Sequence, residues 1–205
     1  MQKDIRWKNL NINTRNIFRG DKLLIKSKDD LKKYIKKEKK IYINSSPKKY
    51  LEQIIINDIN IKVWKFVKAL RYTEYYHNNK GVINKLFYAY FRRKQNNLGR
   101  KLGIEMWDNS IGEGLTIYHA GNIVVNGMCI IGKNLKLHGS NCIGNDGYTL
   151  ESPIIGNNVR LGVGAKVIGN IRIADNITIA AGAVVVNSFE EEGITIGGVP
   201  AKKIK

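Results

Sequence analysis

Branched aliphatic residues recur at every sixth position through the second half of the chain, frequently followed by a small residue. The clearest run consists of Ile155, Leu161, Val167, Ile173, Ile179 and Val185. The same register extends upstream to Ile131, Leu137 and Ile143, across an insertion at residues 146–152. Neither the 3.6-residue period of a helix nor the two-residue period of an exposed strand produces this spacing.

A six-residue period is typical of a three-sided solenoid, in which each face is a short strand followed by a turn. The aliphatic residue points inward and stacks on its equivalents in neighbouring coils. Small residues with Asn or Asp suit the tight turns between faces, as in residues 132–134 and 156–158. Ile111, Ile117 and Ile123 keep the step of six but lie two residues out of phase, which predicts a two-residue insertion near Gly127.

The first half of the chain has helical signals instead. Ser27, with Asp30 three residues later, predicts a capped helix over residues 28–41. Ser46-Pro47 marks a second helix start, because Pro suits the first helical turn. A single buried stripe is then expected from the apolar residues at steps of three or four, namely Leu51, Ile55, Ile59, Val63, Phe66 and Leu70.

This second segment forms one long helix, or two helices broken near Asn57, because residues 57–60 include poor helix formers. Gly81 opens a further helix, whose apolar face runs from Ile83 to Phe91 and fades at residues 96–97. The predicted fold class is therefore α+β, with a helical domain at residues 1–102 and a parallel β-helix of hexapeptide repeats at residues 103–205.

Charge divides the chain at the same place. Residues 1–100 hold 26 Lys and Arg against 8 Asp and Glu, whereas residues 101–205 hold 9 of each. A basic half of this kind indicates either an anionic partner, such as nucleic acid, a membrane surface or an acidic polymer, or simply the solvated faces of Lys-rich helices. Both interpretations stay open.

The sequence also bears on the cellular compartment. No apolar stretch approaches the length that spans a bilayer, and residues 1–6 lead into polar sequence rather than the apolar core of a secretory signal. A cytoplasmic protein is expected, with peripheral contact to the inner face of the membrane as a further possibility. Cys129 and Cys142 form neither a disulfide framework nor a spaced metal cluster.

Residues from 102 to the C-terminus resemble the serine acetyltransferase group of hexapeptide-repeat acyltransferases, particularly its branch in surface-polysaccharide gene clusters. The matching segments are residues 117–125, 155–159, 162–165, 169–171, 180–185 and the ending Gly198-Val199-Pro200-Ala201-Lys202. The resemblance implies a left-handed parallel β-helix, a homotrimer, and acetyl-CoA bound in the groove between subunits as the acyl donor. No metal is implied.

Transfer of an acetyl group to a hydroxyl requires a general base, and imidazole titrates near the working pH. His119 occupies the position where the family carries its catalytic histidine. His138 follows nineteen residues later, so it is expected on the adjacent coil, lining the same pocket or occupying a turn. His77, at a helix end, is expected to be structural.

Three positions depart from the family pattern. The aspartate that orients the family's catalytic histidine aligns with Ile104, so Glu105 or Asp108 is expected to replace it. Tyr118 stands where the family has an aspartate directly before the histidine. The loop that helps hold serine is shortened to residues 145–152. A sugar hydroxyl of a cell-surface polysaccharide, with Tyr118 or Tyr148 as an aromatic platform, is therefore the expected acceptor, and free serine is the alternative.

The resemblance also implies positions for the donor. Val163 and Ala181 are eighteen residues apart, so they stack on one face, where small side chains let the pantetheine arm approach the backbone. Gly144 is placed in the same binding region, and Lys202 is expected to meet the phosphates. The alternative for Val163 and Ala181 is ordinary packing between coils.

The sequence fits two other function classes less well. A zinc-dependent hydrase on the same solenoid needs three converging histidines, but His77 lies outside the repeats. A nucleic-acid-binding protein is not expected, because no recognised motif is present and aromatic residues do not interleave with the basic run.

Overall fold

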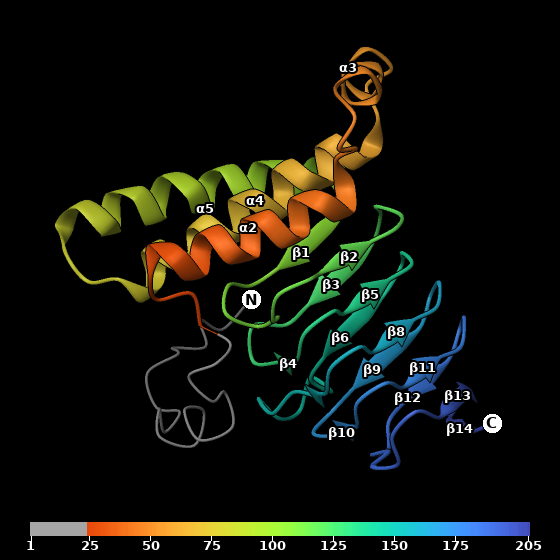
Figure 1. The fold of residues 1–205 in the computed structure, drawn as a ribbon. Coiled ribbons are helices and arrows are strands. Elements are labelled where there is room, and N and C mark those ends of the chain that lie inside the picture. The colour runs from red at the N-terminus through yellow and green to blue at the C-terminus, as the bar shows by residue number, and fades with distance from the viewer. Residues whose placement is uncertain (1–23) are drawn as a thin grey trace.

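The computed structural model describes residues 24–205, so the expectation that residues 1–6 are not a secretory signal lies outside the described part. Helices come first, and all but the short helix at residues 47–55 lie together over one end of the strand region (Figure 1). Their bounds are α2 Lys28–Tyr42, α3 Pro47–Ile55, α4 Ile59–Asn78 and α5 Val82–Leu102. Helix α4 packs against both α2 and α5.

Successive strands of the second half turn from one sheet to the next, so the chain winds as a three-sided coil. One sheet has the order β1-β3-β6-β9-β12, the second β10-β7-β4, and the third β14-β13-β11-β8-β5-β2. All pairings are parallel except that of β13 with β14. We call these sheet A, sheet B and sheet C.

The strands are short, and most span two or three residues. Those of sheet A are β1 Ile104–Met106, β3 Ile123–Val125, β6 Cys142–Gly144, β9 Lys166–Ile168 and β12 Val184–Val185. Those of sheet B are β4 Ile130–Ile131, β7 Ile154–Ile155 and β10 Arg172–Ile173. Those of sheet C are β2 Thr116–Ile117, β5 Lys136–Leu137, β8 Arg160–Leu161, β11 Thr178–Ile179, β13 Thr195–Gly198 and β14 Ala201–Lys203.

The aliphatic column predicted from the six-residue period forms the core. The six residues of its clearest run, Ile155, Leu161, Val167, Ile173, Ile179 and Val185, are all at most 3% exposed. Neighbouring coils stack them in register, as Leu137 pairs with Leu161 and Leu161 with Ile179. The expectation of parallel β-structure in the second half is confirmed.

The two-residue insertion lies elsewhere than predicted. Val125 pairs with Ile143, and the steps from Val125 to Ile131 and from Ile131 to Leu137 are both six. The step from Ile117 to Val125 is eight, so the extra residues lie in the turn between β2 and β3 and not near Gly127. This turn contains His119.

Helix boundaries follow local signals. Ser27 caps α2 and forms the predicted capping box with Asp30. The apolar segment after Pro47 is two helices, because Asn57 adopts a φ of +57° between α3 and α4. The Lys-rich α2 still has a buried side, which includes Leu31, Tyr34 and Tyr42.

Two expectations about the helices are wrong. The stripe expected to be buried is buried only from Val63 onward on α4. Helix α3 stands away from the other helices, and Leu51, Ile55 and the first residue of α4, Ile59, are exposed (Figure 1). Helix α5 does not end where its apolar face was expected to fade, at residues 96–97. It continues to Leu102 and ends at Gly103, which adopts the left-handed conformation typical of a helix end.

A buried charge network joins the helices to the first coil. Arg71 pairs with Glu38 and Glu74, and it also donates to the carbonyl oxygens of Ile111 and Gly112. Its neighbour Glu38 accepts hydrogen bonds from the backbone of the same loop. One hydrophobic cluster runs from α4 into the coils, and the division into domains at residues 102 and 103 stays a prediction.

None of the helices in residues 24–205 combines the length and the apolar character that a membrane span requires.

Candidate active site

The two candidate catalytic histidines lie along one edge of the coil, where the chain turns from sheet C to sheet A. The edge begins at Tyr118 and His119 after β2, continues at His138 after β5, and reaches Val163 after β8 and Ala181 after β11. Backbone hydrogen bonds hold these turns in register, since the Tyr118 amide donates to Leu137 and the His138 amide to Leu161. We call this the C–A edge.

His119 projects from the turn that carries the two extra residues. The turn reverses through Gly121 and Asn122, both with positive φ. His119 stacks over Gly139 of the next coil, where a β-carbon would lie 3.2 Å from the carbonyl oxygen of His119 and 3.3 Å from its Cβ. Its side chain is exposed and has no hydrogen bond or ion pair with another residue in the range 24–205.

His138 lies at the same edge, but the register between β2 and β5 places it beside Tyr118 rather than beside His119. The rings of Tyr118 and His138 stack with centroids 4.3 Å apart. Arg160 donates from Nε to His138 Nε2 over 2.9 Å, so Nε2 is the unprotonated nitrogen. Partial burial lowers the pKa of His138, and the charges of Arg160, His119 and Lys136 lower it further. The imidazole of His138 is therefore held neutral.

Neither of the acids expected to orient His119, Asp108 and Glu105, forms a hydrogen bond or an ion pair with its side chain. Asp108 is buried and pairs with Arg92 at 2.8 Å and with His77. Hydrogen bonding and opposite charge from these two partners lower the pKa of Asp108, against the opposing effect of burial. His77 thus has a defined structural partner at the junction of the helices and the coil.

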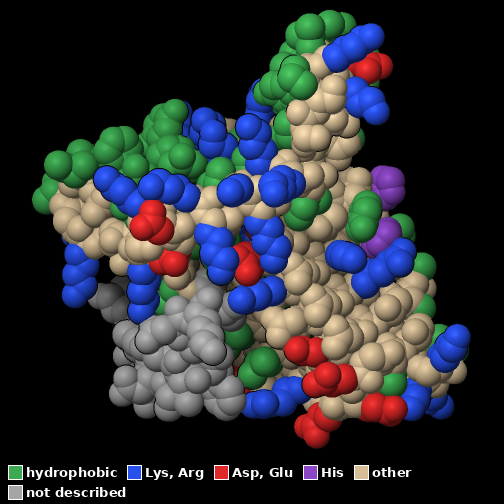
Figure 2. Space-filling model, in the orientation of Figure 1, with side chains coloured by type: hydrophobic (Ala, Val, Ile, Leu, Met, Phe, Trp, Pro, Cys, Tyr) green, Lys and Arg blue, Asp and Glu red, His purple; other side chains and the backbone are tan. Residues whose placement is uncertain are grey.

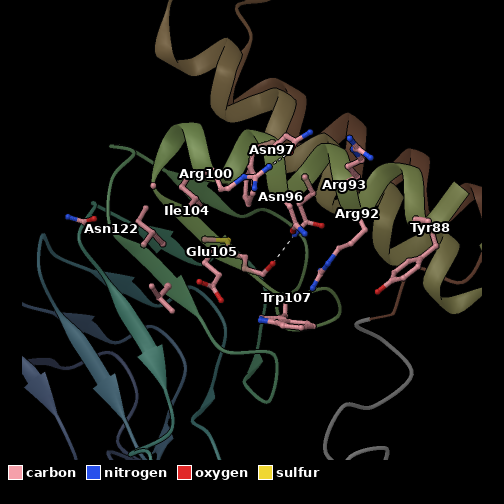
Figure 3. A pocket seen from close by; sticks show the side chains of 18 residues that line it. Tyr88, Arg92, Arg93, Asn96, Asn97, Arg100, Ile104, Glu105, Trp107 and Asn122 are labelled. Atoms are coloured by element: carbon pink, nitrogen blue, oxygen red, sulfur yellow. Dashed lines mark hydrogen bonds between the residues drawn. The ribbon is translucent and has the colours of Figure 1, made fainter. Parts of the chain in front are cut away.

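Glu105 lies on β1 in sheet A and lines a hollow of about 1050 Å³ between α5 and the first two strands of that sheet. Figure 3 shows its carboxylate directed into this space, with Trp107 and Arg92 nearby. Arg92 lies over the Trp107 ring at 4.4 Å. His119 is not among the lining residues, and the role of Glu105 as its partner stays a prediction.

Of the four positions expected to contact the donor, two lie on the C–A edge and two lie elsewhere on the coil. Val163 and Ala181 stack in successive turns of the C–A edge, since the Gly182 amide donates to the Val163 carbonyl at 2.8 Å. Both side chains are exposed. Lys202 lies on β14, at the other end of sheet C from the strand that precedes His119. Gly144 is buried on β6 in sheet A, away from the C–A edge.

Tyr148 lies at a different edge, in the loop where the chain turns from sheet A to sheet B. It is 96% exposed. Asp146 shapes the loop by accepting hydrogen bonds from the backbone of Tyr148 and Thr149. Within one chain, therefore, the two aromatic residues expected at the acceptor lie on different edges of the coil.

Three residues of the site were not found from the sequence. Arg160 was missed because its contact with His138 spans two coils, although Lys136 and Arg160 occupy the equivalent position before the inward residue of their repeats. Gly139 gave a weak signal, as a glycine directly after a histidine at a turn. Asn141 braces the same turn, accepting from the Gly139 amide and donating to Gly162.

Across residues 24–205, no group of three His, Cys, Asp or Glu side chains is arranged to hold a metal ion. Cys129 is buried, which raises the pKa of its thiol to about 12. It is therefore a core side chain rather than a thiolate nucleophile.

Sequence comparison relates about half of the chain to serine acetyltransferases. The Buchnera aphidicola (subsp. Schizaphis graminum) enzyme is 36% identical over 99 residues, which cover 47% of this chain and 38% of the relative. That of Staphylococcus aureus strain Mu50 is 36% identical over 106 residues, covering 50% and 49%. The chain thus spans half or less of the length of these relatives. No family model matches the chain.

Solved structures extend the likeness into the helices. Neisseria gonorrhoeae serine acetyltransferase superposes with a TM-score of 0.63 and 27% identity, over 87% of this chain and 68% of that one. A Brucella abortus serine acetyltransferase, solved with coenzyme A, gives a TM-score of 0.59 and 23% identity over 85% and 66%. The resemblance to serine acetyltransferases is confirmed, with helices followed by parallel strands in both.

These findings correct the expected acceptor. The curated relatives are serine acetyltransferases, and none of those named here acts by its name on a polysaccharide. The prediction of a sugar hydroxyl as the main acceptor is therefore wrong, and the alternative, serine, is better supported. The altered residues on which that prediction was based, Tyr118 and the short 145–152 loop, do not by themselves identify a sugar.

Proposed function

We propose that the chain is an acetyl-CoA-dependent serine O-acetyltransferase in which His119 is the general base. The observation that carries this proposal is the C–A edge, which aligns the histidine of the resembling family with exposed Val163 and Ala181 on later coils. Similarity to serine acetyltransferases over about half of the chain also supports it. The proposal includes the left-handed sense of the coil, which rests on this family resemblance.

The proposed reaction moves one acetyl group. His119 removes the hydroxyl proton as the serine oxygen attacks the thioester carbonyl, and a tetrahedral oxyanion forms. Collapse of this intermediate breaks the carbon–sulfur bond. The proton then passes from His119 to the departing coenzyme A thiolate, so the base is regenerated.

His138 has a supporting role in this proposal. Because Arg160 donates to its Nε2, that nitrogen is not available to accept a proton from the acceptor hydroxyl. The neutral ring and stacked Tyr118 instead form one wall beside His119. The exposed imidazole of His119 is the group that can approach a bound hydroxyl.

Donor binding is proposed along the same edge. Small or short side chains at Val163 and Ala181 leave the backbone accessible to the pantetheine arm, and Lys202 supplies a cation at the far end of sheet C. The Brucella enzyme of the same fold binds coenzyme A, which supports this choice of donor. A trimer is proposed as well, because the family resemblance places the acyl donor in a groove between neighbouring subunits. In this proposed trimer, the edge that carries Tyr148 faces His119 of the neighbouring copy.

The proposal is tested by comparing His119→Ala with His138→Ala. Removal of His119 should lower serine-dependent coenzyme A release by about 10² to 10⁴, the usual contribution of a positioned acid–base group. Acetyl-CoA affinity should change little, and His138→Ala should lose less activity. Thiol release and calorimetric binding would be measured on both folded variants.

Near-normal turnover in His119→Ala, with activity abolished in His138→Ala, would show that the base lies one coil further along. Absence of serine-dependent release in the wild-type protein would reject the proposed acceptor.

A further inference from the structure

Helix α5 presents an apolar face to solvent. Its first three turns expose Val82, Ile83, Leu86, Phe87 and Tyr90, with Val82 75%, Ile83 69% and Leu86 68% accessible. The residues recur at steps of one, three and four, so they form one stripe along the helix. Figure 2 shows hydrophobic side chains gathered over the helical region and bordered by Lys and Arg. A stripe of this size indicates an interaction surface.

A basic groove begins where the stripe ends. The space between α4 and α5 has a volume of about 530 Å³, and its lining includes Tyr90 of the stripe. Four cationic side chains line it, namely Lys65, Lys68, Arg93 and Lys94. Among the described residues that line this groove, none is acidic. We call the stripe and the groove together the α5 surface.

Aromatic stacking fixes the two helices that carry this surface. Tyr72 of α4 stacks on Phe91 of α5 with centroids 4.7 Å apart, and Tyr76 stacks on Phe87 at 5.0 Å. Lys68 lies 6.0 Å from the centre of the Tyr72 ring. The apolar stripe and the cations are therefore held on one rigid pair of helices rather than on mobile loops.

The positive charge of these helices favours an anionic partner over a second copy of the chain. Glu74 is the one acidic residue in α4 and α5, and it is buried against Arg71. Two copies meeting through this surface would bring cations against cations without an acidic partner. Apolar side chains beside lysines instead match the interface of an anionic bilayer, where the apolar groups enter the acyl boundary and the cations meet phosphates.

We propose that the α5 surface docks the protein onto membranes that contain anionic phospholipid. Ile83 and Leu86 enter the interface between headgroups and acyl chains. The lysines of the groove bind the headgroup phosphates, and Tyr90 lies at the level of the headgroups, where aromatic rings with a polar tip are favoured. The binding is independent of the proposed acetyl transfer, because α5 lies outside the C–A edge.

The test is sedimentation of the full-length protein with vesicles. We expect binding to phosphatidylcholine vesicles that contain phosphatidylglycerol, weak binding to pure phosphatidylcholine, and release by salt. Each cation near an anionic leaflet strengthens binding about fivefold, so K65Q/K68Q/K94Q should lower affinity on the order of 100-fold. I83Q/L86Q should also weaken binding, and both side chains are exposed enough for the fold to tolerate the change.

The matched control is K36Q/K39Q/K40Q, which removes the same charge from exposed positions of α2. It should bind nearly as wild type. Equal losses in the two lysine variants would show that net charge alone is responsible, and the proposal would be wrong. Failure of the wild-type protein to bind the anionic vesicles would also overturn it. If I83Q/L86Q changes the oligomeric mass in sedimentation velocity and leaves vesicle binding intact, the surface is a contact between copies instead.

Discussion

Gly139 controls how closely the coil of His138 approaches His119. Its φ of +104° is unfavourable for any residue with a side chain, and a β-carbon there would press on His119. We expect Gly139→Ala to destabilise the fold by about 1 to 2 kcal/mol and to displace the catalytic turn. Chemical denaturation and turnover would be measured on the same preparation.

Gly169→Ala is the matched control, because Gly169 has a similar φ of +98° but no atom within contact of an added β-carbon. It should lose comparable stability and keep its activity. Equal turnover in the two variants would mean that Gly139 does not position His119.

Arg160 is expected to set the protonation of His138. Its charge and its hydrogen bond to Nε2 favour the neutral ring, so Arg160→Gln should raise the pKa of His138 toward its ordinary value near 6.5. The sign follows because a cation next to imidazole disfavours the protonated form. NMR titration is practical with only three histidines in the chain. Arg172→Gln, in sheet B, should leave the pKa unchanged, and an unchanged value in Arg160→Gln would contradict the assignment.

At the scale of elements, the sequence predicted the residues that face inward on each coil but not the position of the insertion between β2 and β3. The six-residue period predicted the inward residues, because each coil repeats the same local packing. It also revealed two extra residues, but the apolar pattern could not locate them, since Ile123 and Val125 are both buried. Only the pairing of Val125 with Ile143 places them in the turn of His119.

The buried faces of the helices were harder to predict from the sequence than the inward residues of the coil. An apolar stripe identifies the face of a helix but not what covers it, so the spacing alone made α3 look like part of the core. Capping and turn signals are local, which is why Ser27, Pro47 and Gly81 gave the starts correctly. The contacts of Arg71 and Arg160 depend on residues far apart in the chain and had no comparable signal.

The Arg71 network is expected to hold the helices on the first coil. Arg71→Met removes the cation from between Glu38 and Glu74, leaving two buried carboxyl groups without their partner. Breaking such a pair costs about 3 to 5 kcal/mol. Urea denaturation should show this loss, while Lys32→Met, at an exposed pair with Asp29, should have almost no effect. Similar midpoints for the two variants would show that the network is not a major contributor.

At the scale of the whole molecule, the proposed trimer, which rests on the family resemblance, would bring together site residues that one chain leaves on different edges. His119 and Tyr118 lie on the C–A edge, whereas Tyr148 lies in the loop between sheets A and B. A head-to-tail ring of three copies places a different edge of each subunit against its neighbour. Sedimentation equilibrium should give three times the chain mass of 23.2 kDa. A monomer at working concentration would contradict a shared site.

Mixed trimers would test sharing directly. If Tyr148 completes the site of the neighbouring subunit, Tyr148→Ala and His119→Ala should each be nearly inactive alone. In trimers reassembled from equal amounts of the two variants, about one site in four pairs an intact His119 with an intact Tyr148. Serine-dependent turnover should then return to about a quarter of the wild-type value. If mixing restores nothing although trimers exchange subunits, His119 and Tyr148 do not act in one shared site, because complementation requires each to come from a different chain.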